Sequence, residues 1–209
     1  MESITLMLII ITENLTSLPK KTTYSLAIQL MFCLCCRIGE LRAAKYSDII
    51  HDEKTGNDYI WLRHQIVDKK AGSKNRRATD VSYMKGHSTA GKRKFPLSGY
   101  ALEIIEKLQE LHPDSEYICS SSKGTPITTN RFNENLKRFC QAAGVPYYSS
   151  HKIRFYAVSD MYDQGVNETT IQRLAGHNNL STTRHYNRKL RDYTLDDDVL
   201  EHGFGLPAG

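Results

Sequence analysis

The chain has 209 residues, 40% of them hydrophobic and 24% charged, which is the composition of a globular protein with room for one domain and its core. The net charge of +5 at pH 7 is a mild excess that suits a polyanionic partner. Five cysteines, three of them crowded at Cys33, Cys35 and Cys36, indicate reduced thiols rather than a disulfide framework or a zinc site. The apolar run at 4–11 is too short to span a bilayer and has no features of a secretion signal, so we expect a cytoplasmic protein.

Two helices are expected at the start of the chain. Residues 2–17 are rich in Leu, Ile and Met, and a strongly apolar helix follows at 22–34 after a break at a proline. Arg37 comes directly after this apolar run, Gly39 allows a turn, and a short helix begins at Glu40. An arginine in such a place is costly unless an anion meets it, and that anion is either Glu40 or a ligand.

Three strands of a small antiparallel sheet are predicted between residues 49 and 98. They are Tyr59–Leu62, Asp80–Met84 and Arg93–Leu97, with a polar, basic loop or irregular strand at 65–79. The last two strands are joined by a hairpin rich in Gly, Ser and Lys. Lys85 and Lys92 lie at this hairpin, where they are either solvated or able to reach a phosphate.

Two amphipathic helices and a short strand follow. The helix at 98–112 repeats Leu102, Ile105 and Leu108 on one face, and the helix at 129–143 is expected to bury Phe132, Leu136 and Phe139. The strand is predicted at 117–120. The outward face of the second helix is basic and is either solvated or a contact to DNA phosphates; it carries Arg131, Lys137 and Arg138.

The stretch from Ser149 to Asn187 holds the residues with the clearest chemistry. His151 and Arg154 lie three apart, which on a helix places both on one face. A helix is predicted at 157–164, and another from Asn167 to Gly176, a typical C-cap residue that leaves His177 in a loop. A further short helix, capped within Ser181–Thr183, is expected to carry Tyr186.

These side chains suit attack by a tyrosine on a phosphodiester. A phenol with a pKa of about 10 is a weak nucleophile unless cations stabilise the charge that develops. Arginine grips phosphate with parallel hydrogen bonds, and histidine moves protons or binds a non-bridging oxygen. Each residue alone has a simpler explanation, such as a packed tyrosine or a solvated histidine at a helix end. Their order and spacing together carry the prediction.

Five sequence elements occur in a characteristic order: C-R-I-G-E-L around Arg37, the basic hairpin at Lys85, H-K-I-R, L-A-G-H, and Tyr186 nine residues after His177. From about residue 15 to 190 the chain resembles the catalytic domain of the tyrosine recombinases, the phage-integrase family. The resemblance implies an α+β, mostly α-helical fold with a small three-stranded antiparallel sheet at one edge. It assigns 1–190 to the catalytic domain and 191–209 to a tail, with no amino-terminal core-binding domain.

The resemblance also implies a role for each matching residue. Arg37 and Arg154 would clamp the scissile phosphate, and His151 would assist proton transfer from Tyr186, which would form a 3′-phosphotyrosine. Lys85 would protonate the leaving 5′-oxygen, although Lys92 is an alternative because the hairpin is longer than usual. His177 would hydrogen-bond a non-bridging oxygen, and Glu40 would support the arginines. Further contacts to DNA are expected from basic side chains: Lys92, Arg93, Arg131, Lys137, Arg138, Lys152 and Arg184.

For such a recombinase no metal, ATP or other cofactor is expected, because the covalent intermediate conserves the phosphodiester energy. The expected partners are double-stranded DNA with a specific crossover site, other protomers in a synaptic tetramer that the tail contacts, and DNA-bending accessory proteins. No membrane is expected, and the protein would be nucleoid-associated when bound to DNA. A type IB topoisomerase, a catalytically silent DNA-binding module and a metal-dependent nuclease are the competing hypotheses.

Overall fold

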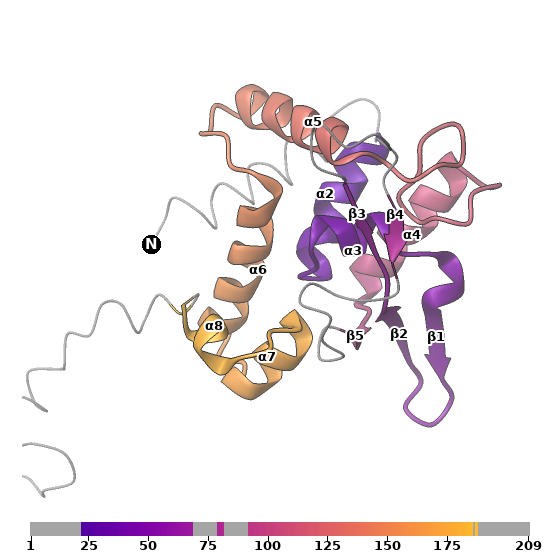
Figure 1. Ribbon diagram of the computed structural model, residues 1–209. Helices are drawn as coiled ribbons and strands as arrows, with labels where there is room; N and C mark the ends of the chain where they lie inside the picture. The colour runs from indigo at the N-terminus through magenta and orange to yellow at the C-terminus, as the bar shows by residue number, and fades with distance from the viewer. Residues whose placement is uncertain (1–21, 69–78, 82–91, 186, 188–209) are drawn as a thin grey trace, which may run out of the picture.

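The computed structural model describes residues 22–68, 79–81, 92–185 and 187 of the chain. In these ranges a group of helices surrounds one apolar core, and short antiparallel strands lie at one edge (Figure 1). The predicted helix at 2–17 lies outside the described residues. No helix in the described ranges is both long and apolar enough to cross a membrane.

The helices largely follow the predicted ones. Their bounds are α2 Thr23–Cys33, α3 Ile38–Ala43, α4 Gly99–Leu111, α5 Thr129–Ala142, α6 Ser150–Asp163, α7 Glu168–Ala175 and α8 Leu180–Arg184, with a 3₁₀ turn at Tyr46–Asp48. The predicted helices at 22–34, 98–112 and 129–143 are confirmed as α2, α4 and α5. On α5 the third buried residue is Cys140, whereas Phe139 is half-buried.

Helix α2 is the centre of the core. It is apolar around most of its circumference, which is typical of a helix covered on all sides, and it packs against α4, α5 and α6. Thr22 begins it as an N-cap, because its hydroxyl accepts a hydrogen bond from the backbone N–H of Ser25. After α2 the chain turns at Cys35, a non-glycine residue with φ +46°. The side chains of Cys35 and Cys36 are both fully buried.

The three-stranded antiparallel sheet is present, but one of its strands differs from the predicted ones: β1 takes the place of the strand expected at 80–84. Its order is β1 (Ile49–Asp52), β2 (Asn57–Leu62) and β5 (Arg93–Pro96). The sequence does not reveal the edge strand β1 because it is short and only half-buried, and a tight turn through Gly56 (φ +68°) joins it to β2. On the other side of β2, buried Ile60 lies opposite buried Phe95, so the apolar face selects β5 as the partner.

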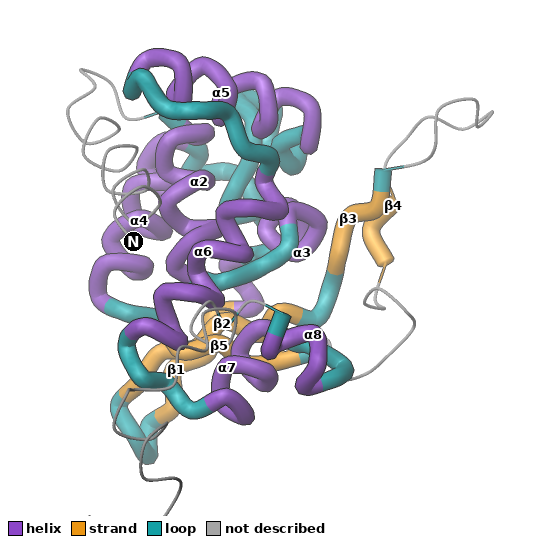
Figure 2. Tube along the Cα trace, turned by 90° about the vertical axis from the view of Figure 1, so that its left-hand side faces the viewer, coloured by secondary structure: helices purple, strands orange, loops and turns teal. Residues whose placement is uncertain are grey.

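The other two strands form a separate pair. Gln65–Val67 (β3), expected within a loop, pairs with β4 (Thr79–Val81), which is expected in the larger sheet from the sequence. Figure 2 shows this pair set apart from the three-stranded sheet. The predicted strand at 117–120 is reduced to isolated bridges, Lys45 with Tyr117 and Ser120 with Pro126.

The last three helices carry the stretch predicted to hold the site (Figure 1). Helix α6 begins at Ser150, seven residues before the predicted helix, so His151 and Arg154 belong to its first turns. Helix α7 is as predicted: the side chain of Asn167 caps it, and Gly176 ends it with φ +64°. Helix α8 begins earlier than expected, after Asn179, and ends at Arg184; Tyr186, which the sequence places on this helix, lies outside the described residues.

Gly39 lies inside α3 rather than at a turn, and its small size is explained by close packing. A Cβ at this position would lie 2.9 Å from the carbonyl oxygen of Ile66 in β3. Helix α3 is also fixed by buried Arg42, which donates to Asp68 at 2.8 Å and to the carbonyl of Ile127. The amino-terminal end of α3, where Arg37 and Glu40 lie, therefore depends on this contact.

We expect Gly39→Ala to destabilise the protein although alanine favours helix. The clash with a backbone oxygen forces α3 or β3 to move and should cost about 1–3 kcal/mol, more than the gain in helix propensity of about 1 kcal/mol. Urea unfolding measures the change. Gly99→Ala is the matched control, because Gly99 is also helical and a Cβ there would meet nothing within 4 Å. Equal midpoints for both variants would contradict the packing explanation.

Candidate active site

The site is built around one buried carboxylate. Glu40 on α3 is 1% exposed, and three guanidinium groups surround it. Arg37 Nη1 lies 2.7 Å from Oε1, whereas Arg93 Nη2 and Arg154 Nη1 lie 3.0 Å and 4.0 Å from Oε2. The cluster joins the start of α3, strand β5 and helix α6, which are far apart in the sequence.

The cations keep Glu40 ionised. Burial alone would raise the pKa of its carboxyl, because it removes the charge from water. The charges of Arg93 and Arg37, a hydrogen bond from Arg93 and the charge of Arg154 together outweigh burial and bring the pKa down to about 2. Glu40 is therefore an anion at any pH at which the protein works.

Arg37 is the accessible member of the cluster. Its side chain is 29% exposed, and its Nη2 lies 3.4 Å from the carbonyl oxygen of Gly176. Its backbone N–H also donates to Glu40 Oε2 at 2.9 Å, so backbone and side chain bind the same carboxylate. This double contact fixes the direction of the guanidinium, and its exposed edge can meet an anion.

Arg154 is held more deeply. It is 2% exposed and donates to two backbone carbonyls, that of Cys35 at 2.9 Å and that of Ala175. The first of these carbonyls belongs to the residue with φ +46°, a conformation that costs about 1–2 kcal/mol and is compensated by such contacts. Burial lowers the pKa of Arg154, but a guanidinium stays charged in proteins. Its remaining N–H groups can donate to an anion in the site.

His177 lies beside the arginines and is neutral. It is 6% exposed, and its Nδ1 lies 3.0 Å from the hydroxyl of Thr183, which is fully buried. Burial, followed by the charges of Arg154, Arg37 and Arg93, lowers the pKa of His177 to about 3. The tautomer that accepts from Thr183 at Nδ1 carries its proton on Nε2 and can donate it to an anion. The sequence alone does not single out Thr183.

Of the remaining predicted catalytic residues, His151 lies at the surface, and two others are outside the described part of the chain. His151 is exposed in the first turn of α6, whereas Arg154, one turn further along the same helix, is buried. Their spacing of three residues keeps both on one side of the helix. Lys85 and Tyr186 lie outside the described residues. The choice between Lys85 and Lys92 therefore stays open.

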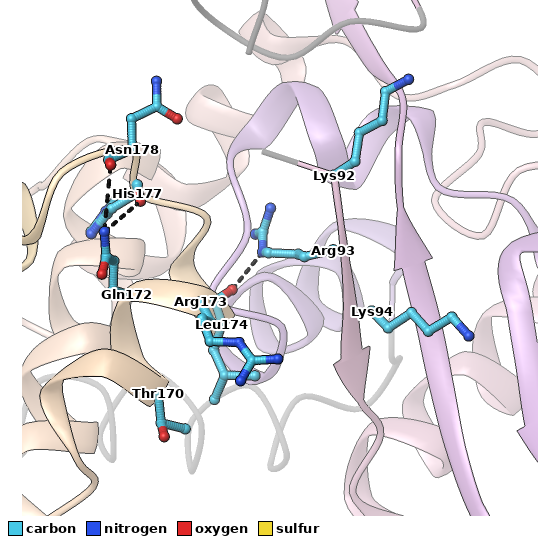
Figure 3. Close-up of a pocket in the computed structure, with 9 residues that line it drawn as sticks. All are labelled: Lys92, Arg93, Lys94, Thr170, Gln172, Arg173, Leu174, His177 and Asn178. Carbon is cyan, nitrogen blue, oxygen red and sulfur yellow. Dashed lines mark hydrogen bonds between the residues drawn. The ribbon is translucent and has the colours of Figure 1, made fainter. Parts of the chain in front are cut away.

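A pocket of about 660 Å³ opens between β5 and α7, next to this cluster. Figure 3 shows Arg93 pointing from β5 toward α7, with a dashed line to Leu174, and Gln172 bonded to the carbonyl of His177. Three exposed cations lie around it, namely Lys92, Lys94 and Arg173. Lys94 and Arg173 are not among the predicted residues, although the alternation of Lys92 and Lys94 along a strand would have placed both on one face.

The predicted DNA-binding side chains are exposed with one exception. Arg93 is expected to contact DNA from the sequence; its side chain is 6% exposed and paired with Glu40 at 3.0 Å, and the predicted DNA contact stays a prediction. The other six residues are at the surface, and some have partners: Arg131 with Glu134, Arg184 with Glu168, and Lys152 over the ring of Phe155. Exposed pairs of this kind are worth little and open easily to a phosphate. The remaining ones are Lys92, Lys137 and Arg138.

The cysteines and acidic side chains do not gather as ligands in the described part. All five cysteines there are free thiols, and no three His, Cys, Asp or Glu side chains come together as a metal site. Burial raises the pKa of the Cys33 thiol to about 11, as expected for a thiol that packs as a small hydrophobic group.

Comparison with known proteins identifies the family. The model of the phage integrase family matches residues 7–192 of this chain. The chain belongs to the phage integrase family. Among curated members, it is 28% identical over 179 residues to the tyrosine recombinase XerC of Staphylococcus epidermidis, an alignment that covers 73% of this chain and 58% of that protein. It is 25% identical over 162 residues to a XerC-like recombinase of Caldanaerobacter subterraneus, covering 70% of this chain and 40% of that one.

Solved integrase-family structures share the fold. The integrase of transposon Tn1549, in complex with circular intermediate DNA, matches 85% of this chain and 59% of its own with a TM-score of 0.70 and 16% identity. A XerA recombinase crystal structure matches 96% of this chain and 62% of its own with a TM-score of 0.65 and 18% identity. The chain thus spans about half the length of the curated relatives it matches.

We expect acid to remove a specific part of the stability of this integrase domain. The pKa of Glu40 is lower in the folded than in the unfolded chain, so its contribution is present above the unfolded pKa of about 4.3 and is lost as pH falls toward about 2. The contribution amounts to about 3 kcal/mol. Urea unfolding of wild type and Glu40→Gln at pH 6 and at pH 3 measures it.

The difference in unfolding free energy between wild type and Glu40→Gln should be smaller at pH 3 than at pH 6. Glu103→Gln is the matched control, because Glu103 has an exposed pairing with Lys107. A Glu40→Gln penalty that stays equal at both pH values would show that folding does not lower the pKa of Glu40.

Proposed function

We propose that this chain is the catalytic domain of a site-specific DNA recombinase that cleaves and rejoins strands through a 3′-phosphotyrosine at Tyr186. The observation that carries the proposal is the anion-directed set of Arg37, Arg154 and neutral His177, organised by the buried carboxylate of Glu40. The names of the relatives, tyrosine recombinases XerC and XerA, support it, as does a fold shared with integrases bound to DNA.

The chemistry follows from the charges. The Tyr186 oxygen attacks the scissile phosphorus, its bond to phosphorus forms, and the bond to the 5′-oxygen breaks. Arg37 and Arg154 stabilise the negative charge on the non-bridging oxygens, with His177 donating a further hydrogen bond. The phenol proton goes to His151, and Lys85 or Lys92 protonates the leaving oxygen. Rejoining reverses these steps, so the covalent bond stores the energy of the cut and neither ATP nor a metal takes part.

We assign residues 1–190 to the catalytic domain and 191–209 to a tail that contacts a neighbouring protomer. The partners of the proposed reaction are double-stranded DNA with a specific crossover site and other protomers in a synaptic tetramer, with DNA-bending proteins as accessories. Such a reaction takes place in the cytoplasm, on the nucleoid. The surface cations on α5, α6 and α8 suit backbone phosphates, with Arg131, Lys137, Arg138, Lys152 and Arg184 as the residues involved.

The test traps the covalent intermediate and selects the cleaved sequence in the same experiment. The protein is incubated in EDTA with nicked duplexes of randomised core sequence, and adducts are recovered from a denaturing gel. Their DNA is sequenced and their modified peptide is mapped. An adduct at Tyr186 supports the recombinase chemistry. Relaxation of any supercoiled plasmid favours topoisomerase action, DNA binding without an adduct favours a silent module, and cleavage that requires a metal favours a nuclease.

Tyr186→Phe should abolish the adduct and leave DNA affinity within about twofold, because the substitution removes only the attacking oxygen. Tyr147→Phe is the matched control, since Tyr147 is 42% exposed and lies beside α5, away from the arginine cluster. Adduct yield on the selected duplex and affinity by fluorescence anisotropy are the measurements. An adduct that persists in Tyr186→Phe would show that another residue is the nucleophile.

A further inference from the structure

We propose that Arg93 is a positioning residue of the active site, which holds the Glu40 carboxylate and fixes the hairpin strand β5 against α7. This inference rests on the proposed recombinase function, because it concerns the same site. Arg93 acts through Glu40 rather than on DNA.

The contacts of Arg93 immobilise its guanidinium on several sides. Nη2 lies 3.0 Å from Glu40 Oε2, and Nε donates to the carbonyl of Leu174 on α7. Gly176 closes the remaining side, since a Cβ there would lie 2.9 Å from Arg93 Nη1 and 3.2 Å from Cζ. With its side chain 6% exposed, Arg93 has little surface left for a phosphate.

These contacts determine where the phosphate-directed groups point. Arg93 and the Arg37 backbone N–H both bind Glu40 Oε2, which leaves Oε1 to the Arg37 side chain at 2.7 Å. Arg154 Nη1 also lies near Oε2, at 4.0 Å. A buried carboxylate that loses one partner draws on another. Arg154 would then turn toward Glu40 and away from the phosphate.

Arg93 also holds strand β5, which borders the pocket, against helix α7. It lies between Lys92 and Lys94 on β5, and Figure 3 shows its side chain extended toward α7 while the two lysines point elsewhere. The bond to Leu174 therefore sets the distance between β5, which Lys92 directly precedes, and helix α7, which ends just before His177. If Lys92 is the general acid, its placement depends on the same contact.

The groups facing Glu40 predict a change of pH profile when Arg93 is removed. They come from β5, α6, the segment between α2 and α3, and the loop after α7: Arg93, Arg154, Arg37, Cys35, Cys36 and His177. Burial raises the pKa of Glu40 and the arginines lower it, with Arg93 contributing most among them. Removal of Arg93 therefore raises the pKa, and Glu40 becomes protonated as the solution is acidified.

The experiment compares Arg93→Met, Arg93→Lys and wild type, with Arg63→Met as the matched control. Arg63 is paired with Asp48 at 2.9 Å and lies outside the arginine cluster, so it reports the loss of an ordinary ion pair. Single-turnover cleavage is measured at saturating duplex selected from the nicked library, from pH 5 to 8. Affinity for a 30-bp duplex is measured against salt, and melting temperature shows which variants are folded.

Arg93→Met should cleave about 100-fold more slowly at pH 7, because misplaced catalytic groups cost rate. Its rate should fall further toward pH 5, whereas the wild-type rate shows no such added fall. Arg93→Lys should recover part of the rate by restoring the charge beside Glu40. The salt slope of DNA binding should match wild type, whereas the loss of a phosphate contact lowers it by about 0.9.

If the salt slope of DNA binding falls by about 0.9 in Arg93→Met or Arg93→Lys, Arg93 contacts DNA and the positioning role is overturned. This result can be read whether or not the wild-type protein cleaves. Wild-type rates in the folded variants overturn the positioning role as well. If wild type itself forms no adduct, the proposed function fails, and the salt slope still decides between the two roles of Arg93.

Discussion

The structure depends on keeping one carboxylate charged inside the protein. Glu40 is 1% exposed, and a lone ionised group in that position would cost several kcal/mol. The arginines beside it change this balance, because each supplies attraction at short range. The carboxylate in turn compensates their mutual repulsion, so cations on α3, β5 and α6 can lie close together. Neither sign of charge could be buried there alone.

This arrangement explains why backbone carbonyls take such a large part in the site. Helix ends and left-handed residues present unpaired carbonyls, and the arginines use them: Cys35 and Ala175 accept from Arg154, Gly176 from Arg37, and Leu174 from Arg93. The carboxyl end of α7 thus binds cations, as its dipole favours. Gly176 serves twice, since its φ of +64° ends the helix and its missing Cβ leaves room for Arg93.

Local patterns predicted the elements of the site better than its long-range contacts. The bounds of α7 follow from Asn167 and Gly176, and the apolar repeats of α4 and α5 identify both helices, because these features depend on neighbouring residues. Strand β1 is too short and too exposed to stand out. The partners of Arg93 are Glu40 and Leu174, 53 and 81 residues away, so alternation along the strand can separate Arg93 from the two lysines but cannot show what it contacts. The contact between Thr183 and His177 spans only six residues, but it depends on how the loop after α7 turns into α8.

The two histidines differ in what their surroundings allow. Burial and the neighbouring arginines lower the pKa of His177 to about 3, so His177 is a neutral hydrogen-bond partner whose tautomer Thr183 influences. His151 is exposed, so water can exchange protons with it directly. In the proposed reaction the arginines, which do not titrate, would stabilise the transition-state charge, and proton transfer would be left to groups at the surface of the site. Separating these two tasks would let the arginine cluster remain fixed while protons move around it.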